Sequence, residues 1–301
     1  MQDADSVRRN LAYTAVALLV AMALVATGVA ALIRAEKPEL PARQEVAVTP
    51  SPAPSPSPSA VPSPSPLTRQ MAALSAGLPA NSVSMAARNL TTGATLAFGA
   101  SGGLTTASAA KVDILATLLL RQQASGATLT GDEDSEATSM IEESDDAAAD
   151  ALWTDIGGAS AMAAANRRLG VGCTVPGQGP AWGLTTTCAL GQIQLLYQLE
   201  STSSPLDESS RDYIVNLMEN VAPSEAWGIP VVADSGTRFA VKNGWLNVDG
   251  ATDWAVTSDG IVTYQGQTLL ISVLTQNEGT VYSGIDLIQR LAPLMARSVA
   301  T

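Results

Sequence analysis

The hydrophobic residues form one long run near the start of the chain and shorter periodic runs further along it. Residues 11–33 form an uncharged apolar run, and a helix of that length, rising about 1.5 Å per residue, would cross a bilayer core of roughly 30 Å. This run predicts a transmembrane anchor, preceded by a short cytoplasmic tail at residues 1–10. A cleaved signal peptide is the alternative, although the apolar region of such a peptide is normally shorter.

A low-complexity segment follows the apolar run. Residues 34–66 are rich in Pro and Ser, most densely from Thr49 to Pro66. This composition lacks apolar bulk and favours extended polyproline conformations, which are typical of a spacer. We therefore expect one folded domain, residues 67–301, held outside the cytoplasm by a single-pass anchor in the cell membrane.

The pattern within the folded domain predicts an α+β arrangement. Residues 82–98 show two short strand-like runs around a turn, which is the pattern of a hairpin. Residues 105–220 are rich in Ala and Leu with helical spacing, strand-like runs return after Pro230, and residues 281–298 resemble a closing helix. Strands and helices segregated in this way predict an antiparallel sheet flanked by helices, with an all-helical lobe alongside.

One lysine interrupts the apolar pattern of the first predicted long helix. In TTASAAKVDILATLLL (105–120), apolar residues cover nearly the whole circumference, so Lys111 would be buried. A buried ammonium is costly unless it is paired. Ser108 precedes it by three residues on the same helical face, so the amine could take the hydroxyl proton. The alternative is a lysine near a helix end that extends its head group to solvent.

The composition narrows the chemistry that is available. The 301-residue chain has no histidine and two cysteines, which excludes a Ser-His-Asp triad and both His-ligated and Cys-only metal sites. We expect no metal and no cofactor. The only lysines are Lys37, Lys111 and Lys242, and lysine is the main remaining base. A net charge of −12 argues against nucleic-acid binding.

Two further motifs contain polar residues that could contribute to a catalytic site. ESDDAAADALW (143–153) begins where a helix is predicted, and VKNGW (241–245) lies on a predicted strand. Taken alone, Ser144 and the following acids could be only a helix N-terminus with favourable charges. KNG, taken alone, could be the corner of a hairpin.

Together with SAAK (108–111), these motifs give the order S-x-x-K, S-D-D, K-N-G. This set resembles the S-x-x-K, S-D-N, K-T-G motifs of the superfamily of class A β-lactamases and penicillin-binding proteins. The stretches GGASAMAAANRRLG and WGLTTTCALGQIQLL are also similar to the central helical region of that family. The resemblance covers most of residues 70–298 and implies the β-lactamase/transpeptidase-like fold.

The resemblance implies a serine hydrolase that acts by acyl transfer. Ser108 would attack a carbonyl, and Lys111 would assist removal of the hydroxyl proton. Ser144 would relay a proton toward the leaving nitrogen. The backbone N–H groups of Ser108 and Trp245 would form the oxyanion hole.

The resemblance also implies a substrate site formed by Lys242, Asn243, Gly244 and Asp146. Lys242, with help from Ser144, would hold the carboxylate of a β-lactam or of a peptidoglycan-derived peptide ending in D-Ala-D-Ala. Asp146 replaces the amide that usually contacts the acylamido carbonyl of the substrate, and a carboxylate cannot donate that bond unless it is protonated. Asn243 replaces a threonine.

The Ω-loop region departs most from the family pattern. No Asp or Glu occurs between Ile156 and Leu199, where class A β-lactamases carry the glutamate that activates the deacylating water. We therefore expect slow deacylation. Cys173 and Cys188 bracket this loop, and an exported location permits a disulfide between them. Two buried free thiols are the alternative.

Two classes of function follow from these motifs. One is a membrane-tethered serine hydrolase acting on β-lactams or peptidoglycan-type peptides. The other is a non-catalytic protein of the same fold that binds cell-wall peptide or a protein partner. Two charged lysines are costly to keep in a cleft without use, which favours the first.

Overall fold

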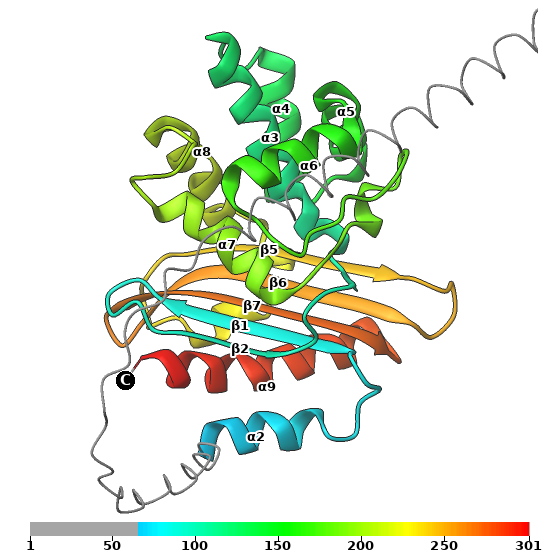
Figure 1. Cartoon of the computed structure of the whole chain (residues 1–301), viewed down its shortest axis with the longest axis vertical. Coiled ribbons are helices and arrows are strands. Elements are labelled where there is room, and N and C mark those ends of the chain that lie inside the picture. Colours follow the sequence, from blue (N-terminus) through cyan, green and yellow to red (C-terminus); the bar gives the residue numbers. More distant parts are fainter. Residues whose placement is uncertain (1–65, 301) are drawn as a thin grey trace, which may run out of the picture. The chain divides into compact units, whose positions relative to one another are not determined.

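The computed structural model describes residues 66–300 (Figure 1). The predicted tail, the anchor at 11–33 and the linker up to residue 65 lie outside the described residues. Within the described range, no helix combines the length and the apolar character needed to cross a membrane.

A five-stranded antiparallel sheet lies at the centre of the described domain. Its strands follow the order β2-β1-β7-β6-β5, so the N-terminal hairpin joins the C-terminal strands through the pairing of β1 with β7. The expected hairpin and the three later strands are confirmed. The strands are β1 (Val83–Asn89), β2 (Thr95–Gly99), β5 (Phe239–Asn247), β6 (Trp254–Tyr264) and β7 (Gln267–Glu278).

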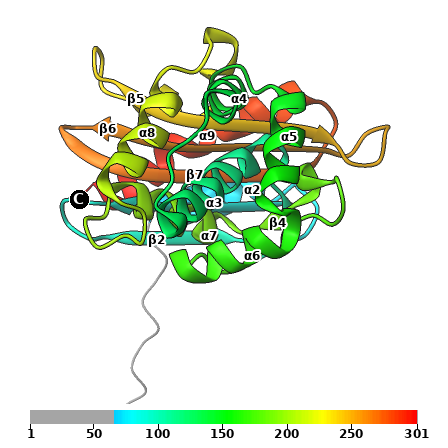
Figure 2. The same cartoon turned by 90° about the horizontal axis from the view of Figure 1, so that it is seen from above.

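Helices cover both faces of this sheet (Figures 1 and 2). On one face lie α9 (Val281–Val299) and α2 (Pro66–Ser75), which begins at the last residue of the predicted linker. On the other face lies the predicted helical lobe. Its helices are α3 (Ala110–Ser125), α4 (Gly131–Glu142), α5 (Asp146–Ile156), α6 (Gly158–Leu169), α7 (Ala189–Glu200) and α8 (Glu208–Glu219).

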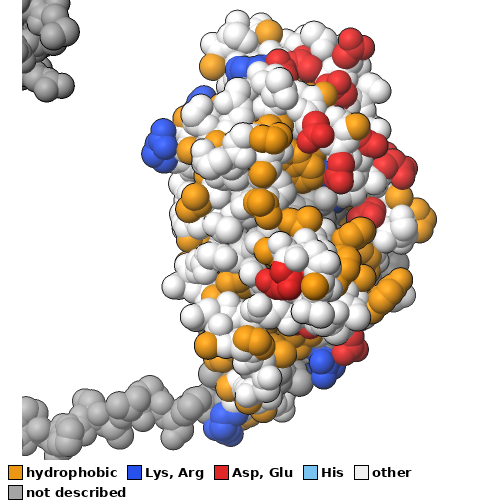
Figure 3. Space-filling view, turned by 90° about the vertical axis from the view of Figure 1, so that its right-hand side faces the viewer, with side chains coloured by type: hydrophobic (Ala, Val, Ile, Leu, Met, Phe, Trp, Pro, Cys, Tyr) orange, Lys and Arg blue, Asp and Glu red, His pale blue; other side chains and the backbone are white. Residues whose placement is uncertain are grey.

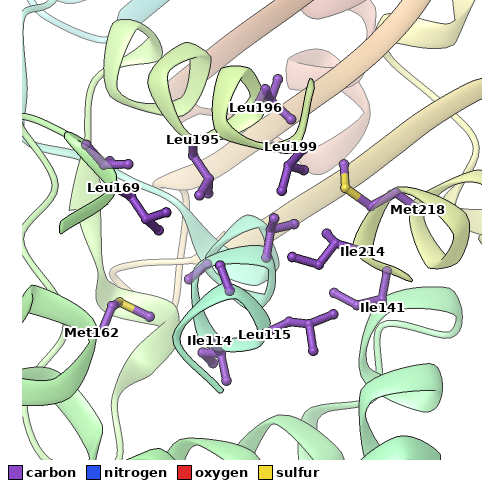
Figure 4. Packing of buried hydrophobic residues seen from close by; sticks show 14 of the residues in the cluster. Ile114, Leu115, Ile141, Met162, Leu169, Leu195, Leu196, Leu199, Ile214 and Met218 are labelled. Carbon is purple, nitrogen blue, oxygen red and sulfur yellow. The ribbon is translucent and has the colours of Figure 1, made fainter. Parts of the chain in front are cut away.

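Helix α3 forms the centre of the helical lobe because its sequence has no polar stripe. All residues from Ala110 to Leu120 are buried, including Lys111. Figure 4 shows apolar side chains of the neighbouring helices gathered around Ile114 and Leu115. The helix ends at Gly126, whose φ of 66° is the left-handed conformation that glycine adopts readily. A second hydrophobic cluster joins α9 to the opposite face of the sheet.

Two alternatives raised by the sequence are wrong. Residues 242–244 lie inside β5 and pair with β6, so KNG is not a hairpin corner. Ser144 precedes α5 but does not cap it, because Asp145 is the N-cap and its carboxylate accepts a hydrogen bond from the Ala148 N–H. Ser144 is therefore left with a hydroxyl that can serve another purpose.

Candidate active site

Ser108 lies in a single 3₁₀ turn, η1 (Ala107–Ala109), which leads directly into α3. Its side chain is half-buried and makes no hydrogen bond within residues 66–300. The preceding Ala107 is buried with a φ of 48°, a left-handed conformation that is unfavourable for alanine. Strained backbone of this kind persists only where the surrounding structure holds it. The turn therefore holds the Ser108 hydroxyl in a fixed place, free of internal partners.

Lys111 lies one turn further along and is fully buried. Its Nζ donates to the Ser144 carbonyl oxygen at 2.6 Å, to Ser144 Oγ at 3.2 Å and to Asp146 Oδ1 at 2.7 Å. Burial lowers the pKa of Lys111, while the hydrogen bond and charge of Asp146 oppose that shift. The alternative of a lysine reaching out to solvent is wrong, because the amine points into this set of acceptors.

Ser144 occupies the short connection between α4 and α5, with a φ of 56°. Its hydroxyl oxygen accepts hydrogen bonds from Lys111 at 3.2 Å and from Lys242 at 2.9 Å. A hydroxyl has two acceptor positions and one donor proton. With both acceptor positions used by the lysines, the proton of Ser144 is available to a third group in the cleft.

Lys242 reaches the same hydroxyl from β5. It is fully buried, and its Nζ also donates to the Asn243 carbonyl at 3.0 Å. Burial, and then the positive charge of Lys111, lower the pKa of Lys242 to about 7. Its ammonium and neutral amine are therefore both accessible near neutral pH.

Asn243 is buried, and its amide nitrogen donates to the carbonyls of Glu225 at 2.6 Å and Trp227 at 2.9 Å. Both N–H groups are thus used to hold residues 225–227, at and after the end of η3 (Pro223–Glu225), against β5. The substrate-binding role of the Asn243 side chain stays a prediction. Burial lowers the pKa of both lysines, and the negative charge of the Glu225 carboxylate opposes that shift.

Gly244 allows β5 to approach the turn that carries Ser108. A Cβ at this position would lie 2.6 Å from the Thr106 carbonyl oxygen and 2.7 Å from the Ser108 nitrogen. Neither backbone atom could move away without disrupting the turn. Only glycine fits, and the close contact brings the strand that carries Trp245 beside the Ser108 N–H. The Trp245 side chain itself is 53% exposed.

The loop between α6 and α7 is closed by a disulfide between Cys173 and Cys188, whose Cα atoms are 5.9 Å apart. The predicted bridge is present, and the alternative of two free thiols is wrong. This loop contributes an aromatic ring to the site: Trp182 lies 4.9 Å from Lys111 Nζ. Its indole N–H donates to Asp150 Oδ1 at 2.7 Å, which fixes the ring.

The structure thus brings four of the predicted polar side chains together: Lys111, Ser144, Asp146 and Lys242. Sequence reasoning missed Glu225 and Trp182. Glu225 is separated by 17 positions from Lys242, and the Asn243 side chain holds its backbone next to β5. Trp182 lies in a stretch already similar to the family, but nothing in its neighbours signals that it faces a lysine.

Comparison with protein families gives a match to the family described as "Beta-lactamase enzyme family" over residues 135–298. The match contains Ser144 and Lys242 and begins after Ser108 and Lys111. The protein named "Putative lipoprotein LppW" in Mycobacterium bovis and Mycobacterium tuberculosis is 28% identical over 200 residues, 65% of this chain. The chain spans 62% of the length of these relatives.

Solved structures of β-lactamases and of a related protein share the fold. PBP-A matches with a TM-score of 0.66 and 20% identity, over 77% of this chain and 95% of that chain. A β-lactamase from Chitinophaga pinensis matches with a TM-score of 0.67 and 18% identity, over 77% and 98%. A class A β-lactamase from Mycobacterium abscessus gives 0.63 and 17%, over 77% and 98%. The predicted fold, an antiparallel sheet flanked by helices, is confirmed.

Proposed function

Because this chain belongs to the β-lactamase enzyme family, we propose that it is a serine hydrolase acylated at Ser108 by β-lactams or by peptides ending in D-Ala-D-Ala. The observation that carries this proposal is the convergence of two buried lysines on one hydroxyl. Lys111 and Lys242 both donate to Ser144 Oγ, and Lys111 lies within one helical turn of Ser108. Buried amines of this kind, with their pKa values lowered, are typical of catalytic sites.

The chemistry runs in two stages. Ser108 Oγ attacks the carbonyl carbon, and its proton passes to Lys111 once that amine has lost a proton of its own. The amide or lactam C–N bond then breaks, and the leaving nitrogen receives a proton through the Ser144 hydroxyl. The N–H groups of Ser108 and Trp245 would stabilise the negative oxygen of the intermediate, at the point where Gly244 lets the two segments approach.

The second stage, hydrolysis of the acyl-enzyme, would be slow. The loop between α6 and α7 contains no carboxylate, and it presents the Trp182 ring to Lys111. A mutant of the structurally similar PBP-A was solved as an acyl-enzyme complex with penicillin G. The present chain would likewise form an acyl-enzyme that accumulates.

A non-catalytic binding function is the second candidate, and one observation favours it. All three N–H groups of the Lys111 ammonium have acceptors, so this nitrogen offers no lone pair to the Ser108 proton in the state described. A protein that retains this state would bind cell-wall peptide without turning it over.

We also propose that the folded domain acts outside the cytoplasm, held at the membrane through residues 11–33. The Ser/Pro-rich linker supports this location, as does the disulfide. The relative in M. tuberculosis carries the name of a lipoprotein. In this chain the only cysteines are those of the bridge, so no cysteine near the apolar run is available for lipid attachment, and a hydrophobic anchor is the better proposal.

Intact-protein mass spectrometry after exposure to a fluorescent penicillin tests the catalytic proposal. We expect a covalent adduct on Ser108, its loss in Ser108→Ala, and much slower formation in Lys111→Ala. Absence of any adduct with β-lactams or D-Ala-D-Ala peptides, in a folded protein that still binds the peptide, would establish the second candidate instead.

A further inference from the structure

Asp146 presents a free carboxylate oxygen at the mouth of the candidate site. Its Oδ1 accepts the hydrogen bond from buried Lys111 at 2.7 Å. The Asp146 side chain is 76% exposed, and its Oδ2 has no partner among residues 66–300. Lys111 therefore fixes one oxygen, and the other belongs to an exposed side chain next to the candidate catalytic residues, where it can bind a group of the substrate.

The carboxylates around the two lysines make the mouth of the site less positive than the lysines alone would. Burial lowers the pKa of both lysines, and the charges of Asp146, Glu225 and Asp145 oppose that shift at Lys111, as those of Glu225 and Asp146 do at Lys242. Figure 3 shows acidic side chains spread over the helical lobe on one face of the molecule. A purely anionic substrate therefore meets a mixed field and not a simple cationic pocket.

The polarity of Asp146 decides which substrate group can lie against it. An ionised carboxylate only accepts hydrogen bonds. A substrate carbonyl placed there would face another acceptor and would remove water from a charged group without compensation. A substrate ammonium would instead form a charge-assisted hydrogen bond, which is about twice as strong as a neutral one.

We propose that Asp146 selects zwitterionic substrates, in which a carboxylate is held by Lys242 and an amine close to the scissile bond is held by Asp146. The inference rests on the proposed acylation of Ser108 and names its substrate class. Suitable substrates are β-lactams with an amino group on the side chain, and peptides in which a residue before the D-Ala-D-Ala end carries a free amine. Glu225 adds to the same preference through its charge.

Two penicillins that differ by one amino group give a sharp test. Ampicillin carries an ammonium on its side chain, and penicillin G has hydrogen in that place. Rate constants for acylation of Ser108 by each compound would be measured by mass spectrometry on the folded protein. We expect wild type to prefer ampicillin, and Asp146→Asn to reduce the ratio of the two rate constants about tenfold, the size of one hydrogen bond to a charged group.

The ratio separates recognition from any change in the basicity of Lys111, because both compounds use the same base. Asp132→Asn is the matched control. Asp132 is exposed in the first turn of α4, at the opposite end of that helix from Ser144, so its removal changes the net charge equally and should leave the ratio unaltered. Asp146→Glu keeps the charge and should keep the direction of the preference.

Each outcome decides the proposal. If both penicillins acylate Ser108 and the ratio is the same in wild type and Asp146→Asn, the inference is wrong while the proposed function stands. If Asp132→Asn changes the ratio as much as Asp146→Asn does, the preference comes from net charge and Asp146 is not its source. If neither compound acylates any of these variants, the proposed function fails and takes the inference with it.

Discussion

Three acceptors surround the Lys111 ammonium, and in the proposed mechanism they decide when this residue can act as a base. The Ser144 carbonyl, Ser144 Oγ and Asp146 Oδ1 use its three N–H groups. To accept the Ser108 proton, Lys111 must first release one of its own. Burial favours that release, while the negative charge of Asp146 opposes it. Asp146 therefore stabilises the unreactive charged form.

Asp146→Asn should make Lys111 a better base near neutral pH. Loss of the carboxylate removes the main interaction that raises the pKa of Lys111, so that pKa should fall further below its ordinary value. The rising limb of the pH profile for acylation should move to lower pH, and acylation at pH 7 should become faster. The measurement is the rate of Ser108 acylation by penicillin G between about pH 5 and pH 10.

Lys111→Ala provides the control for this profile. Loss of the base should slow acylation by roughly 10² to 10⁴ and flatten the rising limb. A limb that moves to higher pH in Asp146→Asn, or does not move, would show that Asp146 does not hold the Lys111 proton.

Four polar side chains that the structure brings together could be predicted because each lies in a short linear motif: Lys111, Ser144, Asp146 and Lys242. Two others could not. Glu225 reaches the lysines because the Asn243 amide binds its backbone, and this contact depends on a fold that brings residues 18 positions apart together across η3 and β5. The same contact uses an N–H group of the Asn243 side chain. Trp182 faces Lys111 only because the closed loop between α6 and α7 carries it there.

At the scale of elements, the loop between α6 and α7 departs from the pattern that the family resemblance leads one to expect. The disulfide closes it, and the Trp182 indole holds it against α5 through Asp150. The loop supplies a hydrophobic ring where the family resemblance leads one to expect a carboxylate. In the proposed function, this loop would shape the site and would not activate water.

The acyl-enzyme on Ser108 should outlive the acylation step by a wide margin. Loss of general-base help typically costs roughly 10² to 10⁴ in rate, enough to separate a trapped adduct from fast turnover. The measurement is the decay of the penicillin adduct after excess compound is removed, followed by intact mass. Rapid multiple-turnover hydrolysis would contradict it, and comparison of Asp146→Asn with Glu225→Gln would then identify which carboxylate activates water.

The disulfide should contribute about 3 kcal/mol to the free energy of unfolding, because it links cysteines that are 15 positions apart. Replacement of Cys173 and Cys188 by serine removes the covalent link. The new hydroxyl at the second position could still cap α7, as Cys188 Sγ does now by accepting the Gly191 N–H. Urea denaturation of the double variant measures the loss. Equal stability of oxidised wild type, reduced wild type and the double variant would show that the bridge does not stabilise the fold.

Most elements could be predicted because their hydrophobic period is clear. The strand-like runs of β5 to β7 and the mostly apolar first half of α3 form the elements that the sequence predicts. The ends of helices are harder to predict where two neighbouring polar residues could each cap the helix. In the SDD sequence, the cap could have been Ser144 or Asp145, and the structure chooses Asp145, which leaves the serine to the lysines. Sequence alone does not rank two good capping residues.

At the scale of the whole domain, two buried carboxyl groups lie outside the candidate active site. Asp113 on α3 and Asp259 on β6 are 1% and 3% exposed, and none of their carboxyl oxygens makes a well-formed hydrogen bond to residues 66–300. Burial raises the pKa of each to about 7, although the nearby Asn166 and Ser272 side chains oppose the shift. For Asp259, the charge of Asp113 adds to it. They lie where the helical lobe meets the sheet.

These two groups should make the domain less stable as the pH rises. The pKa of each is about 4 in the unfolded chain and about 7 in the folded protein. Between these values the folded state binds more protons, so the stabilisation is complete below about pH 4 and is lost as the pH rises through about 7.

Thermal unfolding of wild type at about pH 5 and about pH 7.5 should show a lower Tm at the higher pH. The double variant Asp113→Asn with Asp259→Asn should show a smaller difference in Tm, because its amides do not ionise. Lys242 has the opposite effect on stability. Its pKa is lowered to about 7, so the buried ammonium lowers stability at low pH. That cost falls as the pH rises above about 7 and the amine loses its proton. The comparison of wild type with the double variant isolates the two carboxyl groups from Lys242 and from every surface carboxylate that both proteins share. A Tm that falls equally in both proteins would show that Asp113 and Asp259 keep ordinary pKa values, and that water reaches them where the helical lobe meets the sheet.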